Sequence, residues 1–248
     1  RQIGKSVALA VIALWAVFYN KFPSGRTIHD RNTKVIIISR DDDAAKKLMA
    51  EIRSMLIAGD AHIALMTEGQ QTSYFTSRVS ADRKDPDNKK QLTYRSFNSK
   101  LTDRPCTINT FPPTESVRGN SGDVLILDEI KDIDDIIYKE AIKPTVSTTG
   151  GIIVASGTPG GQKGFFFDIF DPFEKYDEHE YKRFWFPWTV CEIEAQRKVV
   201  EQERVNAERM GQTRSFLQEY EAEFTVDEAA FFELDKVDYD RLKEFSKS

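Results

Sequence analysis

The sequence predicts an α/β fold in which a mostly parallel β-sheet carries helices on both faces. Three short apolar runs rich in β-branched residues, at 34–39, 124–127 and 151–155, indicate strands that are buried on both faces. Helical segments separate these runs, and strands that alternate with helices are typical of a parallel sheet. The 248 residues, of which 40% are hydrophobic, can bury one large core and a small second subdomain.

The first helical segment is the apolar run Val7–Tyr19, which suits a helix buried on such a sheet. Arg1 and Lys5 precede the run, as basic residues precede the apolar part of a secretory signal. The run is nevertheless too short to span a bilayer, and no small-residue cleavage site follows it. We therefore interpret it as a buried helix and expect no membrane partner.

A second helix is expected after the first strand. Asp41 or Asp42 can cap this helix, and its apolar positions keep a helical spacing up to Gly59, where we expect it to end. The other expected elements are a charged surface loop at 81–91, short strands around Thr93–Phe97 and Thr107–Phe111, and a helix near Asp134–Ile142.

The composition changes beyond Gly164, where an aromatic-rich stretch precedes two heavily charged helices, Glu192–Met210 and Arg214–Glu223. The aromatic side chains either stack on bases or form the core of a lid packed on the sheet, and the lack of interleaved basic residues favours the lid core. These side chains are Phe165, Phe166, Phe167, Phe170, Phe173, Phe184, Trp185, Phe186 and Trp188. We predict a core domain at 1–164, a lid subdomain at 165–230 and a linker at 231–248.

Charge and cysteine content narrow the class of protein. The formal net charge of −5 argues against a passive nucleic-acid coat protein, which is usually strongly basic, but it is compatible with a motor that grips DNA locally. The two cysteines, Cys106 and Cys191, predict no disulfide framework and a reducing compartment. The three histidines lie far apart, without metal-ligand spacing: His29, His62 and His179.

A glycine-lysine-serine turn directly precedes the first helix. Backbone N–H groups around Gly4 can point at a phosphate, and the helix N-terminus adds a favourable potential. Lys5 would place its ammonium on the β- and γ-phosphates of a nucleotide, and the Ser6 hydroxyl would bind Mg²⁺. An α/β nucleotide-binding domain needs a strand before this turn, and the sequence starts at Arg1, so we expect the core to be truncated at its N-terminus.

Two carboxylates, Asp128 and Glu129, follow the strand at 124–127. They come at its carboxyl end, where ligands of open α/β sheets bind. Asp128 can hold Mg²⁺ with its water shell, and Glu129 can orient and deprotonate the attacking water. A solvated acidic turn is the alternative, but together with the upstream turn and helix the pair favours a P-loop NTPase of the ASCE (RecA-like) type.

A third motif, Ser-Gly-Thr-Pro at 156–159, follows the strand at 151–155. A hydroxyl at the tip of a buried strand can sense the γ-phosphate or the attacking water and pass its presence to the next segment. A simple Gly-Pro turn is the alternative. The two preceding motifs favour the sensor.

These motifs together resemble the ATPase domain of viral large terminases. The Arg-Gln-x-Gly-Lys-Ser turn at 1–6 is similar to the variant phosphate loop of that family, and Val-Arg-Gly at 117–119 is similar to its Arg-Gly element before the acidic strand. Residues 156–159 resemble its coupling motif. The segment 216–224 resembles the one that leads toward its nuclease domain, and it discriminates best against helicases, which share the earlier motifs. The match covers nearly the whole chain in order.

The resemblance implies roles for individual residues. Glu129 is the catalytic carboxylate, and Asp128 binds the metal together with Ser6. The implied nucleotide-binding residues are Arg1, Gln2, Ile3, Gly4, Lys5 and Ser6, of which Arg1 can also approach the γ-phosphate.

Arg118 would be an arginine finger that serves its own or a neighbouring subunit. The alternative is a solvated loop arginine before the Gly-Asn-Ser-Gly run at 119–122, which is expected to be flexible. Thr158 would couple hydrolysis to movement, with Ser156 and Gly157 in the same motif.

The resemblance implies a packaging motor with ATP and Mg²⁺ as cofactors, which drives double-stranded DNA into a capsid. Its partners would be DNA, the portal of the procapsid and the small terminase subunit, in a homo-oligomeric ring in the host cytoplasm at the assembling capsid. Nuclease activity is not expected, because the acidic nuclease cluster is absent. One alternative is a superfamily 2-type DNA helicase or translocase, which would need a second motor lobe. The other is a module that binds ATP without hydrolysing it, which would have no use for Glu129.

Overall fold

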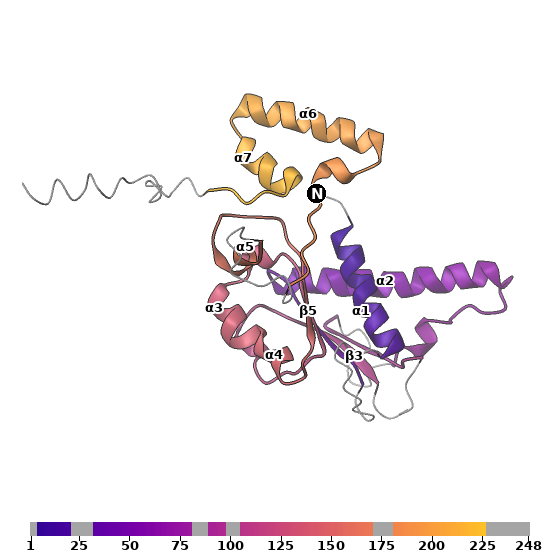
Figure 1. Ribbon diagram of the computed structural model, residues 1–248. Coiled ribbons are helices and arrows are strands. Elements are labelled where there is room, and N and C mark those ends of the chain that lie inside the picture. The colour runs from indigo at the N-terminus through magenta and orange to yellow at the C-terminus, as the bar shows by residue number, and fades with distance from the viewer. Residues whose placement is uncertain (1–3, 21–31, 81–88, 98–104, 171–180, 227–248) are drawn as a thin grey trace, which may run out of the picture. The chain divides into compact units, whose positions relative to one another are not determined.

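The computed structural model describes residues 4–20, 32–80, 89–97, 105–170 and 181–226 (Figure 1). The chain divides into two compact units, the first ending at Thr158 and the second beginning at Pro159. Most of the expected surface loop at 81–91 and the whole of the expected linker at 231–248 lie outside the described residues.

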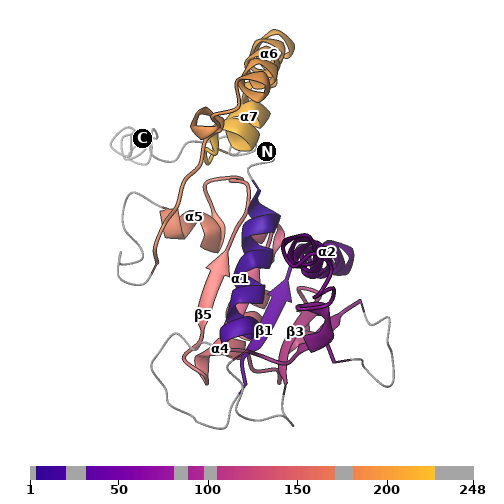
Figure 2. The ribbon, with the colours of Figure 1, turned by 90° about the vertical axis from the view of Figure 1, so that its right-hand side faces the viewer.

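The first unit is built on a five-stranded sheet with the strand order β2-β3-β1-β4-β5. Figure 2 labels three of these strands, β3, β1 and β5. β1 pairs in parallel with β3 and β4, β4 pairs in parallel with β5, and β2 pairs antiparallel with β3. The predicted mostly parallel sheet is confirmed, with β1, β4 and β5 as neighbouring parallel strands. The strands are β1 (Lys34–Ile38), β2 (Gln91–Tyr94), β3 (Cys106–Phe111), β4 (Val124–Leu127) and β5 (Ile152–Ala155).

Both faces of the central strands are covered, as the fold class predicts. Val35 and Ile37 of β1 belong to the core under α1 and α2, whereas Ile36 and Ile38 point to the opposite face and are also buried. β5 departs from the prediction, because its residues are only partly buried and Ala155 is exposed. β5 ends the order of described strands, so it has a hydrogen-bonded strand on one side only.

Helix α1 (Lys5–Tyr19) forms where the apolar run predicts a helix. Gly4 precedes it with φ 77°, a left-handed conformation that glycine adopts without steric cost. One face packs in the core, but the prediction of a fully buried helix is wrong. Every fourth residue of the other face is about half exposed: Val7, Val11, Trp15 and Tyr19.

Helix α2 (Asp42–Met66) has Asp41 as its N-cap, with the carboxylate accepting from the Ala44 N–H at 2.7 Å. The prediction that this helix ends at Gly59 is wrong. Gly59 lies inside α2, and a Cβ there would come within 2.9 Å of the Phe75 ring, so the glycine permits a close approach of the following loop.

The expected helix near Asp134–Ile142 forms, but in two pieces. Asp134 caps the first piece by accepting from the N–H groups of Ile136 and Ile137, at 2.8 and 3.0 Å. The segment runs through η3 (Ile130–Asp132), α3 (Asp135–Ile137), the π-turn η4 (Tyr138–Ile142) and α4 (Pro144–Ser147), and α4 contacts β4. Two single 3₁₀ turns precede it in the chain, η1 (Thr76–Arg78) and η2 (Glu115–Val117). The strand expected around Thr93–Phe97 starts at Gln91 instead and ends at Tyr94.

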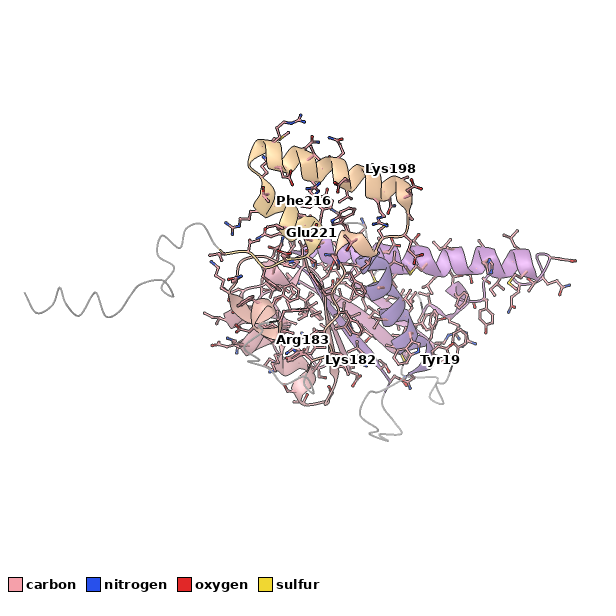
Figure 3. The ribbon with its side chains drawn as sticks, turned by 45° about the horizontal axis from the view of Figure 1, so that its top comes forward. Tyr19, Lys182, Arg183, Lys198, Phe216 and Glu221 are labelled. Atoms are coloured by element: carbon pink, nitrogen blue, oxygen red, sulfur yellow. The ribbon has the colours of Figure 1, made fainter. Side chains whose placement is uncertain are left out.

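The second unit contains both predicted charged helices. They are α6 (Glu194–Met210) and α7 (Thr213–Phe216), which continues into the π-turn η6 (Leu217–Glu221), and α5 (Gly164–Phe170) and η5 (Trp188–Val190) precede them. Phe216 is buried, and Glu221 accepts from the Trp188 indole N–H at 2.8 Å (Figure 3).

The aromatic stretch divides into two groups. The rings of Phe166, Phe167 and Phe170 lie 5.3–5.8 Å from that of Phe224, and Phe165 is buried, as a packed core requires. Placing the whole stretch in the core is wrong, however. Three of its members are more than half exposed: Phe184, Trp185 and Phe186.

Candidate functional site

The carboxyl ends of β4 and β5 bring two of the predicted motifs together. Leu127 pairs with Ala155 in the parallel register, so Asp128 and Ser156 follow at the same level. The ladder continues past the strands, because the Ser156 N–H donates to Leu127 at 2.8 Å and the Asp128 N–H donates to Ile38 at 2.9 Å. The Ser156 hydroxyl donates to Asp128 Oδ1 at 3.0 Å, which joins the acidic and Ser-Gly-Thr motifs directly.

Burial raises the pKa of Asp128 above its ordinary value, and the hydrogen bond from Ser156 offsets only part of this effect. The neighbouring carboxylate of Glu129 raises the pKa further. A partly buried carboxylate of this kind is stabilised in its ionised form by a nearby cation. Asp128 therefore has the chemistry that a Mg²⁺ ligand requires.

Glu129 adopts a left-handed backbone conformation, with φ 51° and ψ 48°. A side chain makes this conformation costly by about 1–3 kcal/mol, and such residues cluster at functional sites. The following N–H, that of Ile130, donates to the carbonyl of Ser156 at 3.1 Å and holds the turn closed. The turn places the Glu129 side chain next to Lys5, which lies near the N-terminal end of the same unit.

Lys5, in the first turn of α1, contacts both remaining motifs. Its Nζ lies 3.2 Å from Glu129 Oε1 and donates to Thr158 Oγ1 at 3.4 Å. Both charged side chains are about three-quarters shielded from solvent. The turn before α1, the acidic strand end and the coupling motif are therefore one cluster, although Lys5 and Thr158 are 153 residues apart.

The other predicted site residues are placed less closely. Gly4 and Ser6 flank Lys5 and are exposed, and Gly157 lies between the two contacting residues of its motif. Arg1, Gln2 and Ile3 fall outside the described residues, so their phosphate-binding role stays a prediction.

Arg118 is placed apart from this cluster. It follows η2, and its guanidinium binds Glu115 and, at 3.3 Å, Glu140 Oε2. The run after Arg118 has local contacts, since Asn120 hydrogen-bonds twice to the Val117 carbonyl and Gly122 packs against Ile36, while its expected flexibility stays a prediction. Hydrogen bonds to the Val117 carbonyl thus hold the backbone on either side of Arg118.

Two of these contacts were not predicted from the sequence. The spacing of three residues between Glu115 and Arg118 is a signal for an ion pair that was available in the sequence. Glu140 carried no signal, because it follows Arg118 by 22 residues and reaches it only through the packing of η4 against η2.

Two kinds of feature are absent from the described part of the chain. No group of three or more histidine, cysteine or acidic residues has the arrangement of a metal cluster there. None of the helices described combines the length and apolar character that crossing a membrane requires. A site with one or two carboxylates fits Mg²⁺ that is bound mainly through a nucleotide and water.

Solved structures with a similar fold come from phage large terminases. The ATPase domain from Thermus phage P74-26 matches with a TM-score of 0.55 at 19% identity, over 91% of this chain and 86% of that one. The large terminase of another thermophilic bacteriophage, solved in complex with ATP-gamma-S, matches with a TM-score of 0.57 at 15% identity, over 95% of this chain. This chain spans 49% of that second protein. At these identities the matches establish the fold, which is that of terminase ATPase domains.

A sequence comparison establishes the family. Residues 1–238 match the model of the terminase large subunit, T4likevirus-type, N-terminal. No curated protein matches the chain. The chain belongs to this family of terminase large subunits.

Proposed function

We propose that this chain is the ATPase motor of a DNA-packaging terminase and couples ATP hydrolysis to the translocation of double-stranded DNA into a capsid. The observation that carries the proposal is the cluster of Lys5, Glu129 and Thr158, with Asp128 bound to Ser156 beside it. Family membership and the fold support it, and the large terminase of the thermophilic bacteriophage was solved in complex with ATP-gamma-S and with ADP.

The N-terminus of α1 is where the nucleotide phosphates would bind. The free N–H groups of its first turn and the Lys5 ammonium favour negative charge there. Gly4 presents no side chain, and no atom of the described residues lies within 4 Å of the position that a Cβ would take, which would let phosphate approach the backbone closely. Asp128 and the Ser6 hydroxyl would hold Mg²⁺, which supplies charge neutralisation at the β- and γ-phosphates.

Glu129 would orient the attacking water and accept its proton. A bound triphosphate carries more negative charge than Glu129, so it would draw the Lys5 ammonium away from that carboxylate. Binding of the nucleotide would therefore free the Glu129 carboxylate for water and withdraw Lys5 from Thr158. Thr158 is the last residue of the first unit, which suits a residue that passes this change on to the following segment.

Arg118 would act as the arginine finger of a neighbouring subunit, since its guanidinium lies away from the cluster in its own chain. The active form would then be a homo-oligomeric ring at the portal of the procapsid, with the small terminase subunit and double-stranded DNA as partners, in the host cytoplasm.

A packaging assay with the full-length protein tests the proposal. ATP should drive DNA into procapsids, measured as DNA protected from nuclease, and Lys5→Ala should abolish both nucleotide binding and packaging. The matched control Lys198→Ala removes an exposed lysine of α6 and should leave packaging intact. Strand separation without packaging would indicate a helicase, and ATP binding without hydrolysis by the wild-type protein would indicate a binding module.

A further inference from the structure

Two glutamates from different elements hold the guanidinium of Arg118. We infer that Glu115 and Glu140 are positioning residues, which orient Arg118 toward the nucleotide of a neighbouring subunit. The inference rests on the proposed function of Arg118 as an arginine finger. It adds a pair of carboxylates without which that finger would sample many rotamers.

The donors of Arg118 are divided between the two glutamates. A guanidinium carries five N–H donors in one plane. Glu115 accepts from Nε and, at 3.1 Å, from Nη2, and Glu140 Oε2 accepts from Nη2 at 3.3 Å. Nη1 makes no hydrogen bond within the described residues, so its two donors remain for a phosphate oxygen. The two glutamates therefore bind the Nε and Nη2 atoms of the guanidinium and leave Nη1 available to a ligand.

The two glutamates stand on anchored backbone. Glu115 opens η2, which ends in the fully buried Val117, and the Arg118 N–H closes the same turn onto the Glu115 carbonyl at 3.0 Å. Glu140 lies in η4 between the buried residues Tyr138 and Ile142. Because both supports are anchored and η2 contacts η4, the two ion pairs favour one direction of the Arg118 side chain before any nucleotide arrives.

All three side chains are about half exposed, so these ion pairs add little to folding stability. Their effect on a rate can be larger. A side chain that is already ordered does not lose its rotamer freedom in the catalytic step. For arginine this freedom limits the effect to about 30-fold, which corresponds to about 2 kcal/mol.

The first test replaces Glu140 in the full-length protein under conditions where subunits assemble. Glu140→Ala should lower ATP turnover about 5- to 30-fold and leave nucleotide affinity unchanged. Glu140→Gln should keep most of the activity, because its amide oxygen still accepts a hydrogen bond. The matched control is Glu208→Ala, which removes an exposed carboxylate bound to Arg204 at 2.6 Å in the second unit. Unchanged or increased turnover in Glu140→Ala would overturn the inference, since an increase would mean that the glutamates withhold the finger.

The second test asks whether a variant damages the catalytic base of its own subunit or the arginine finger that it gives to a neighbour. Subunits with Glu140→Ala should be rescued by Glu129→Gln subunits, which retain a well-oriented finger, and should not be rescued by Arg118→Ala subunits. Rescue between Glu129→Gln and Arg118→Ala subunits is the reference. If the reference fails, the proposed finger in trans is wrong. If the reference succeeds and Glu140→Ala does not sort with Arg118→Ala, the positioning role is wrong.

Discussion

Lys5 Nζ lies 3.2 Å from Glu129 Oε1, so the lysine assigned to phosphate and the carboxylate assigned to water are each other's counter-ion. Lys5 comes from the first turn of α1, and Glu129 comes from the strained turn after β4. If Lys5 binds phosphate as proposed, the attraction of phosphate and of Glu129 for the same ammonium would link nucleotide affinity to the freedom of the Glu129 carboxylate.

This linkage predicts the behaviour of Glu129→Gln. The variant keeps the size and polarity of the side chain and removes the base, so turnover should fall by about 10²–10⁴-fold. Nucleotide should still bind, at least as tightly as to the wild type, because the neutral amide competes less well for Lys5. Single-turnover hydrolysis and calorimetric titration of the full-length protein measure the two effects. Near-normal hydrolysis would remove Glu129 from its proposed role.

The role of Arg118 distinguishes a ring motor from a self-contained ATPase. An arginine finger is worth about 10³–10⁵ in rate. If Arg118 acts in trans, the isolated subunit should hydrolyse ATP slowly, and the specific activity should rise steeply with protein concentration. Mixing Glu129→Gln subunits with Arg118→Ala subunits should restore activity, because some interfaces then combine an intact base with an intact finger. Absence of rescue at every ratio, where wild-type subunits assemble, would place Arg118 in its own site or outside catalysis.

The buried carboxylate of Asp60 should make the free energy of unfolding depend on pH. Burial raises the pKa of this carboxyl, but hydrogen bonds from Thr76 and Phe75 outweigh burial and hold the pKa below its ordinary value. The stabilisation is therefore present above the unfolded-state pKa and is lost as the pH falls through the folded-state pKa. Asp60→Asn should cost about 1–3 kcal/mol near neutral pH, because buried donors lose a charged acceptor. The difference from wild type should shrink below a pH of about 4.

Denaturant unfolding at several pH values measures this difference. Asp43→Asn, on the same helix but largely exposed, is the matched control and should change stability by no more than about 0.5 kcal/mol. Equal losses in the two variants at pH 7 would contradict the role of Asp60.

Gly59→Ala should destabilise the protein, although alanine in a helix interior is ordinarily better than glycine by about 0.5–1 kcal/mol. The added Cβ would meet the Phe75 ring at 2.9 Å, and that ring packs against Phe18 and Tyr74. We expect a loss of about 1–3 kcal/mol from overpacking. In a Phe75→Leu background the penalty should fall, and thermal unfolding of the four proteins measures the coupling. A stabilised Gly59→Ala protein would show that the loop moves aside at no cost.

Several parts of the fold and site were determined by the sequence alone. The runs at 35–38 and 124–127 consist of β-branched and other apolar residues, which fit strands covered on both faces, and the alternation with helices set their parallel arrangement. Parallel strands end at one edge of a sheet. The polar residues that follow them, Asp128 and Ser156, were therefore expected at the same edge, and they contact each other because β4 and β5 are adjacent.

The tertiary structure decided the contacts that depend on the path of the chain between elements. It showed that α2 continues past Gly59, and that the Phe75 ring occupies the space a side chain at Gly59 would need. It left β5 partly exposed, since a strand's burial depends on neighbours that its own residues do not encode. It also brought Glu140 to Arg118 across 22 residues, because side-chain pairing at that distance follows from the packing of two short turns and from no local pattern of charge.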